Sequence, residues 1–476
     1  MLKDLKPYPV YKDSGVEWLG EVPAHWEVRK VRDVARVING YPFDSGRFSQ
    51  PAGVPLIRIR DLNKTQTAVR YDGPFVEAAR VNPGDVLIGM DGDFNVGIWR
   101  GSEPALLNQR MCCVRSANPA TEKFLAYLLP RPLKVINDVT WSTTVKHLSS
   151  GQVERIQFPL PPLPEQTAIV RFLDYVDRRV RRVIRARRRR IELLEEYKQA
   201  LIHQTVTGQT DVRTGKPYPA YKDSGVEWLG KVPEHWEIRA LGRAGSVVGG
   251  MTPSMDKPEY WGGAIPWVTP KDMKHAEIRD SIIRVTDQAL AETPLHVIEP
   301  PAVLVVVRGM ILARHIPIAW TSAPVTINQD MKALVTHTGI LPQFIVHFLN
   351  TNQDALAPLI DEAGHGTKRL PMEHWTKFPV LVPPPAEQSA IVERIETQLA
   401  TFDATIAATR REIELLQEFR TRLVADVVTG KLDVREVAAR LPEEEPDLDD
   451  LEPEDDEAGN EPDEEDPGAE DDDDQG

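Results

Sequence analysis

The chain contains two copies of one sequence pattern. Residues 6–29 read KPYPVYKDSGVEWLGEVPAHWEVR and residues 216–239 read KPYPAYKDSGVEWLGKVPEHWEIR, with 20 of 24 positions identical. Further along, PPLPEQTAIV at 161–170 matches PPPAEQSAIV at 383–392. A tandem duplication with a period of about 210 to 220 residues constrains the fold more than any local motif does, because each copy should form the same structural unit.

Length and composition narrow the class of protein. A single hydrophobic core stops growing near about 250 to 300 residues, so a chain of 476 residues should form at least two domains. No apolar run approaches the roughly 18 residues that span a bilayer, and the start lacks a secretory apolar segment, so we expect a cytoplasmic protein. The two cysteines, Cys112 and Cys113, are adjacent in an apolar stretch, where we expect a strand.

The net charge of −15 is distributed unevenly along the chain. Residues 443–476 hold 21 Asp and Glu and no Lys or Arg, so removing them from the total leaves residues 1–442 at +6. The body of the chain is therefore mildly basic. The acidic end has too little apolar content to offset the entropy of ordering and is predicted to be disordered.

Each copy ends in a segment typical of a long helix. Proline-rich breakers precede Glu165 and Glu387, where helices should begin because proline fits a first helical turn. Two helices of about 40 residues, or about 60 Å, are predicted to pair with each other. The alternative, packing of each helix on its own domain, suits helices of only about 8 to 20 residues. The predicted heptad seams are Val180, Ile184, Arg187, Ile191, Leu194, Lys198, Leu201 and Thr205, and Phe402, Ile406, Thr409, Ile413, Leu416, Arg420, Leu423 and Val427.

The remaining regions mix short apolar runs with frequent Gly and Pro, which favours compact domains with many turns. Helices are predicted at 123–129 and 343–349. The fold class is therefore mixed α/β (α+β), with two similar domains separated by two long antiparallel coiled-coil helices in a pseudo-twofold internal repeat. The predicted boundaries are 1–160 and 211–382 for the domains, 161–210 and 383–435 for the helices, and 436–476 for the disordered acidic tail.

A search for catalytic motifs finds none that would make the chain an enzyme. It has no Asn-Pro-Pro-Tyr or Asp-Pro-Pro-Tyr, no phosphate-binding loop and no His/Cys cluster at zinc spacing. Asp91-Gly92-Asp93 is interpreted as a turn, because a calcium loop needs a longer series of ligands. His25 and His235 occupy the same repeat position and are interpreted as structural. The nine arginines in 178–190 fit either phosphate or acidic-partner contact, or a solvated helix face.

The ordered motifs resemble the specificity subunits of type I restriction-modification enzymes. The motifs are YKDSGVEWLG, PxHWE, Glu-Gln-xx-Ile-Val, Ile-Glu-Leu-Leu and Val-Thr-Gly, each present in both copies, together with Asn-Gln at 108–109 and 328–329 and the segments 56–62 and 266–273. The resemblance implies two target-recognition domains that read a bipartite double-stranded DNA site. It also implies two methyltransferase subunits that use S-adenosylmethionine, and restriction subunits that use ATP and Mg, with no cofactor or metal bound by this chain.

The duplication separates candidate DNA-binding residues into two sets. Residues shared by both copies are expected to fold, to position phosphates or to dock partners, whereas base readout should lie where the copies differ. The shared candidates are Arg60 and Lys271, Asn108 and Asn328, Gln109 and Gln329, and Lys146 and Lys368. The differing candidates are Arg47, Arg58, Lys64, Arg70, Arg100, Arg110 and His147 in the first domain, and Lys257, Lys274, Arg308, Arg314, His315 and Arg369 in the second.

Two other functions stay open from the sequence. One is a coiled-coil adaptor that joins two protein partners without contacting nucleic acid. The other is a stand-alone DNA-binding protein without a restriction partner. A basic surface on both domains would favour DNA binding over the adaptor.

Overall fold

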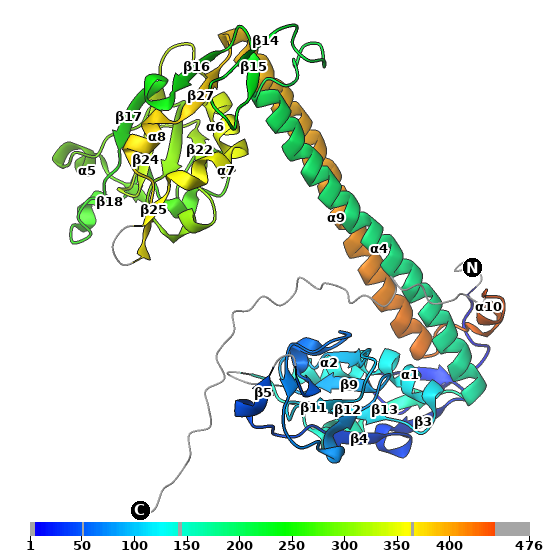
Figure 1. Ribbon diagram of the computed structural model, residues 1–476. Coiled ribbons are helices and arrows are strands. Elements are labelled where there is room, and N and C mark those ends of the chain that lie inside the picture. The colour runs from blue at the N-terminus through cyan, green and yellow to red at the C-terminus, as the bar shows by residue number, and fades with distance from the viewer. Residues whose placement is uncertain (1–4, 50–51, 141–144, 363–365, 443–476) are drawn as a thin grey trace, which may run out of the picture. The chain divides into compact units, whose positions relative to one another are not determined.

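The computed structural model describes residues 5–49, 52–140, 145–362 and 366–442. The chain divides into two compact units: unit 1 is Met1–Arg187 with Arg411–Gly476, and unit 2 is Arg188–Arg410. Both long helices, α4 (Leu163–Val206) and α9 (Pro385–Val428), run from one unit into the other (Figure 1). Among the described helices, none combines the length and apolar character needed to cross a membrane.

Unit 1 is a mixed α/β unit whose core lies in two main sheets. The first is antiparallel, in the order β10 (Val96–Ile98), β9 (Val86–Gly89), β12 (Met111–Arg115) and β4 (Arg36–Asn39). The second is β5 (Phe48–Ser49), β7 (Arg70–Tyr71), β6 (Val54–Ile57), β11 (Ala105–Leu107) and β8 (Arg80–Val81), with β6 and β11 parallel. The helices are α1 (Pro119–Leu128), α2 (Pro130–Val139) and α3 (Ser150–Arg155).

Two expectations for unit 1 are confirmed. The helix predicted at 123–129 is α1, which begins earlier because the Asn118 side chain caps the amides of Ala120 and Thr121. The cysteines lie buried in β12, where burial raises the pKa of the Cys112 thiol to about 12. The thiol therefore stays protonated and packs as a small hydrophobic group.

Unit 2 repeats this arrangement. Its larger sheet is β17 (Gly245–Gly249), β24 (Met331–Thr336), β21 (Ala302–Val306), β22 (Ile318–Thr321) and β19 (Glu277–Ile278). Its smaller sheet is β20 (Arg284–Val285), β18 (Trp261–Val268) and β23 (Thr326–Ile327), with β18 and β23 parallel. The helices are α5 (Asp287–Glu292), α6 (Pro342–Thr351), which confirms the prediction at 343–349, α7 (Gln353–Leu356) and α8 (Met372–Lys377).

The long helices pack against each other in each unit along the predicted seams. Every seam position is buried or half-buried, whereas most of the intervening positions are exposed. Contact partners on α9 come earlier in the chain as the position on α4 advances, so the helices are antiparallel within each unit. The pairs are Asp177–Arg420 and Arg187–Glu412 in unit 1, and Glu195–Arg410 and Lys198–Asp403 in unit 2.

The repeated signature closes each unit against the end of a long helix. In unit 2, residues 216–239 follow α4 directly, and the Tyr221 hydroxyl donates to Gly208 O. In unit 1, residues 6–29 come from the start of the chain, and the Tyr11 hydroxyl donates to Gly430 O, just beyond α9. The same local structure is thus built from contiguous chain in unit 2 and from two distant segments in unit 1.

The signature histidines hold the start of each long helix. His25 Nε2 lies 2.9 Å from Glu165 Oε2, and His235 Nε2 lies 2.8 Å from Glu387 Oε2. Both glutamates are buried, and a buried carboxylate must be paired to offset its loss of hydration. These contacts support the structural interpretation of the two histidines.

The boundary predicted for the acidic tail needs a correction. Residues assigned to a disordered segment from 436 onward begin with a short helix, α10 (Arg435–Ala439). This part is ordered because Val437, Ala438 and Leu441 are buried in unit 1, and because Arg171 Nη2 donates to Leu441 O. The predicted disorder of 443–476 concerns residues outside the described ranges.

Candidate nucleic-acid interface

Three separate segments meet at one end of the β9–β12 strand pair in unit 1. Met90 N donates to Arg110 O (2.9 Å), Leu148 N donates to Met90 O (2.7 Å), and Gly92 N donates to Lys146 O (3.0 Å). We call residues 90–92, 108–111 and 146–148 rim 1. These backbone bonds bring together side chains that are far apart in the sequence.

Unit 2 builds the same arrangement at the matching end of β21 and β24. Val307 N donates to Asp330 O (2.8 Å), Leu370 N donates to Val307 O (2.9 Å), and Gly309 N donates to Lys368 O (3.0 Å). We call residues 307–309, 328–331 and 368–370 rim 2. Each of these three backbone hydrogen bonds in rim 2 has an equivalent in rim 1.

The shared asparagines shape the turn before the central strand. Asn108 Oδ1 accepts from Arg110 N (3.2 Å), and Asn328 Oδ1 accepts from Asp330 N (3.1 Å). An amide oxygen that bonds its own chain two residues later stabilises a tight turn. Both asparagines therefore have a structural role, while the neighbouring Gln109 and Gln329 are exposed at the turn.

The two shared lysines are also tied to local structure. Lys146 Nζ donates to the backbone and side-chain oxygens of Asn137 on α2 (2.8 and 3.1 Å). Lys368 Nζ lies 2.8 Å from Glu362 Oε2. Each lysine therefore supports the rim segment from which it projects.

A basic turn lies beside each rim. Strands β6 and β11 are parallel, as are β18 and β23, so the turns that follow them meet at one sheet edge. Asn108 N donates to Ile57 O, and Asn328 N donates to Val268 O, which joins the turns directly. The candidates carried by or following these turns are Arg58, Arg60 and Lys64 in unit 1 and Lys271 and Lys274 in unit 2.

Other predicted residues are not at the rims. Arg100 follows β10, whose Ile98 pairs with Val86, so it lies at the opposite end of the sheet from rim 1. Lys257 donates to the Tyr260 hydroxyl (2.7 Å) and lies over its ring, just before β18 of unit 2. Arg47 precedes β5 and Arg70 lies in β7, while Arg314 and His315 follow the short 3-10 helix Met310–Ala313 that leaves rim 2.

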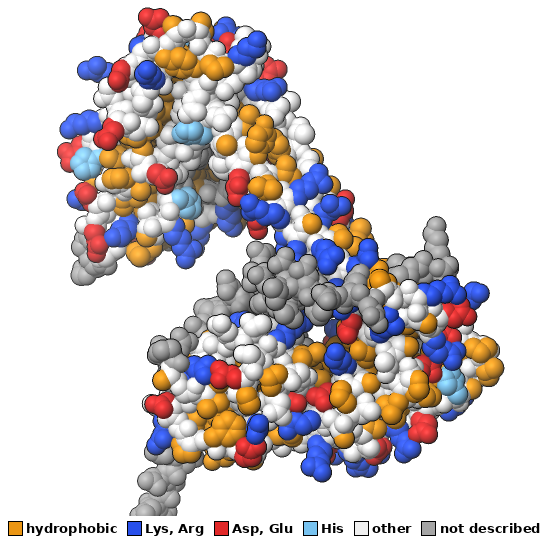
Figure 2. Space-filling model, turned by 45° about the vertical axis from the view of Figure 1, so that its right-hand side comes forward, with side chains coloured by type: hydrophobic (Ala, Val, Ile, Leu, Met, Phe, Trp, Pro, Cys, Tyr) orange, Lys and Arg blue, Asp and Glu red, His pale blue; other side chains and the backbone are white. Residues whose placement is uncertain are grey.

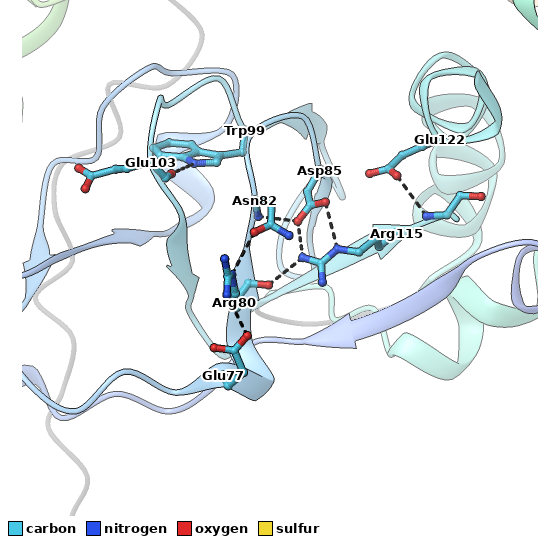
Figure 3. A network of polar contacts seen from close by, with 9 residues as sticks. Glu77, Arg80, Asn82, Asp85, Trp99, Glu103, Arg115 and Glu122 are labelled. Atoms are coloured by element: carbon cyan, nitrogen blue, oxygen red, sulfur yellow. Dashed lines mark hydrogen bonds and ion pairs between the residues drawn. The ribbon is translucent and has the colours of Figure 1, made fainter. Parts of the chain in front are cut away.

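The opposite end of the β9–β12 pair in unit 1 carries a polar network around the buried Asp85 (Figure 3). Arg115 donates to both carboxylate oxygens of Asp85 and to Arg80 O (2.9 Å), and Asn82 N donates to Asp85 Oδ2 (2.7 Å). Asp85 is buried, and the two hydrogen bonds from the Arg115 guanidinium offset the cost of burying its negative charge. The network anchors the strands from which rim 1 projects.

Two rim residues were missed by the sequence argument. The sequence predicts only a turn at Asp91, and Asp330 is an acid rather than one of the basic and amide side chains expected to contact DNA. Asp91 Oδ1 lies 2.7 Å from His147 Nδ1, and Asp91 Oδ2 lies 3.6 Å from Arg110 Nη1. Carboxylates can accept from the cytosine amino group or orient a neighbouring donor. A search for charged residues of either sign next to Asn-Gln would have found Asp330.

Charge on the visible surface is mixed rather than uniform. Figure 2 shows basic side chains interspersed with acidic and apolar ones. Within the arginine-rich part of α4, Arg181 pairs with Asp177 (2.7 Å) and Arg187 with Glu412 (2.7 Å). Among the described residues, no group of three or more His, Cys, Asp or Glu could hold a metal ion.

Each of the two like-built units thus carries an exposed polar rim at the end of its central strand pair, as expected of a duplicated protein. A family model described as "Type I restriction modification DNA specificity domain" matches residues 23–193 and 233–418. These ranges cover well over half of the chain, which therefore belongs to this family.

Individual relatives agree with this assignment. The type I restriction enzyme EcoBI specificity subunit of Escherichia coli is 37% identical over 232 residues, which cover 48% of this chain and 48% of that protein. The EcoR124I/EcoR124II specificity subunit of the same organism is 28% identical over 277 residues, covering 57% and 62%. The chain thus spans about half to three fifths of these relatives.

The fold has a counterpart among solved structures. A chain from "Structural basis underlying complex assembly and conformational transition of the type I R-M system" superposes with a TM-score of 0.66 at 16% identity. The match covers 86% of this chain and 98% of that chain. At this identity the likeness establishes the shared fold.

Proposed function

We propose that this protein is the specificity subunit of a type I restriction-modification complex, recognising a bipartite asymmetric DNA sequence without catalysing a reaction itself. The observation that carries the proposal is the presence of one rim in each unit, with matching backbone hydrogen bonds and different exposed side chains. A common backbone can approach the duplex in the same manner twice, while different side chains read different bases. Each unit would therefore contact one part of the target.

The long helices suit the role of a spacer between the two target-recognition domains. Each is 44 residues long, or about 66 Å at 1.5 Å per residue. Paired helices resist bending better than a flexible linker, and half-sites on one face of DNA are separated by multiples of about 34 to 36 Å. A pseudo-twofold arrangement of like domains about this pair would hold the half-sites at a fixed separation.

The partners follow from the proposed complex. Two methyltransferase subunits with S-adenosylmethionine would modify adenine, and restriction subunits with ATP and Mg would cleave unmodified DNA. The duplicated parts of the chain, namely the signatures and the long helices, offer two equivalent docking surfaces for the methyltransferase subunits. We place this complex in the cytoplasm, where its DNA substrate is found.

Co-expression with the methyltransferase subunit of the same system tests the proposal. Adenine methylation is mapped across the host genome, with the methyltransferase subunit alone as the control. The expected result is one motif made of two different short sequences separated by unspecified bases, absent from the control. A continuous motif, or no motif from a complex that forms, contradicts the proposal, and the latter result favours the adaptor function.

A further inference from the structure

The rims contain three pairs of structurally equivalent positions. The strand registers align Met111–Gly89 in unit 1 with Met331–Val306 in unit 2. Continuing from these anchors, Asp91 bridges to His147 in rim 1 as Arg308 bridges to Arg369 in rim 2. Met90 N donates to Arg110 O as Val307 N donates to Asp330 O, so positions 110 and 330 are also equivalent. The equivalent positions are 91 and 308, 110 and 330, and 147 and 369.

The charges at these positions are exchanged between the units. Rim 1 has an acid at 91 and an arginine at 110, whereas rim 2 has an arginine at 308 and an acid at 330. The third pair is His147 and Arg369. Nothing in the backbone requires the exchange, because the hydrogen bonds of the two rims are the same. The difference therefore lies in the surface that each rim presents.

The side chains differ in how they can reach a ligand. In rim 1 the Asp91 side chain is only 14% exposed, whereas its partners Arg110 and His147 are 59% and 72% exposed. In rim 2, Arg308 and Arg369 are both exposed. Rim 1 thus presents one arginine and one histidine beside a carboxylate, and rim 2 presents two arginines, of which Arg369 lies 3.9 Å from Asp361 Oδ2.

We infer that these three pairs of positions determine which bases each unit reads, an inference that rests on the proposed function. Arg110 reads a guanine in the half-site of unit 1, and Asp91 is a positioning residue that orients Arg110 and His147. Arg308 and Arg369 read guanines in the half-site of unit 2. The fork of an arginine side chain donates two hydrogen bonds to guanine O6 and N7, which no other base edge accepts in the same way.

Arg→Lys variants test the inference, because lysine keeps the charge but lacks the planar fork. The complex with the methyltransferase subunit is incubated with duplex libraries in which one half-site is randomised at a time, and bound DNA is sequenced. R110K is expected to weaken the preference for guanine at one position of one half-site by about 5- to 150-fold. R308K and R369K are expected to do the same in the other half-site.

Two further variants serve as the positioning test and the control. D91N should weaken the same preference as R110K, with the melting temperature unchanged, whereas a purely structural role would lower the melting temperature and leave the preference intact. R36K changes an exposed arginine of β4 that pairs with Arg115, at the opposite end of the same sheet from rim 1, and should leave both half-sites unchanged. The melting temperature of each variant confirms that it is folded.

Three results would overturn the inference. One is an R110K complex that keeps the wild-type preference in both half-sites. Another is an R110K complex that binds all sequences equally less tightly, since this assigns Arg110 to a phosphate. The third is a wild-type complex without bipartite preference, which contradicts the proposed function as well, so the two failures can be distinguished.

Discussion

Unit 1 and unit 2 share one strand register but differ at both ends of the central strand pair. At one end, unit 1 has the ion pair between Arg115 and the buried Asp85 where the register places Val335 and Ala302 in unit 2. At the other end, the two rims exchange an acid and a base. The two units therefore keep the same backbone hydrogen bonds in the sheet although the side chains at the strand ends differ. These side chains can change without changing the backbone.

The largest effect is expected at the Asp85–Arg115 pair. R115A should lower the free energy of unfolding of unit 1 by about 3 kcal/mol, because the buried carboxylate of Asp85 loses its partner. We take the lower end of the usual range of stability losses for a broken buried ion pair, because the Arg115 side chain is 31% exposed. Hydrogen exchange of the β9 and β12 amides measures the loss within unit 1.

The matched control gives unit 1 the residues that unit 2 has at these positions, Ala302 and Val335. In D85A/R115V both charges are removed together, and replacing a buried pair by apolar residues is often close to neutral. The double variant should therefore be much more stable than R115A. A double variant as unstable as R115A would show that the network supports the fold through its shape rather than its charge.

The next effect concerns the glycines that follow the long helices. Gly430 and Gly208 have φ of +78° and +76°, and a Cβ on either would lie 2.4 Å from Cδ of Pro23 or Pro233. G430A and G208A should each cost about 2 kcal/mol, from the left-handed conformation and the clash. Only in unit 1 does the signature lie on a different segment from the long helix against which it packs, so proteolysis should release residues 6–29 in G430A and spare 216–239 in G208A. Equal cleavage would contradict the difference in closure.

The smallest effect is pH-dependent. Burial alone would raise the pKa of Asp433, but hydrogen bonds from the Arg435 side chain and backbone lower this pKa below its usual value. In unit 2, Arg213 lowers the pKa of Asp211 in the same way. A lowered pKa contributes stability above the pKa of the unfolded chain, about 4, and this contribution is lost as the pH falls through the folded value.

D433N should therefore lower the stability of unit 1 by about 1 kcal/mol at pH 7, allowing for the half-exposed arginine, and by progressively less as the pH falls below 4. D211N is the equivalent change in unit 2. Melting curves between pH 2.5 and 7 measure both. A difference between D433N and wild type that does not shrink in acid would rule out the ion pair as its cause.

Periodic features of the sequence were predicted well because they depend on local spacing. The repeat, the long helices, their seams, α1 and α6 all follow from patterns within one segment. The shared Asn-Gln pairs were also found at the rims, since both copies contain them. The domain boundaries and the contacts of individual residues with DNA remain predictions.

Contacts between distant segments could not be predicted. The sequence did not reveal that unit 1 is closed by residues near both ends of the chain, because the signature in the second copy follows its helix directly. It suggested Arg100 on the basis of charge, although the antiparallel pairing of β9 and β10 carries this residue away from rim 1. It dismissed Asp91, whose partners His147 and Arg110 are 56 and 19 positions away along the chain.

The proposed function requires the helix pair to set the distance between the two half-sites. Deleting 188–194 and 405–411 together removes one heptad from each helix between the Arg187–Glu412 and Lys198–Asp403 pairs, preserving the seam. Seven residues correspond to about 10 Å of helix, or about three base pairs of DNA. Genome-wide methylation should show both half-sites unchanged and the gap shortened by about this amount. An unchanged gap, or altered half-sites, would contradict the account.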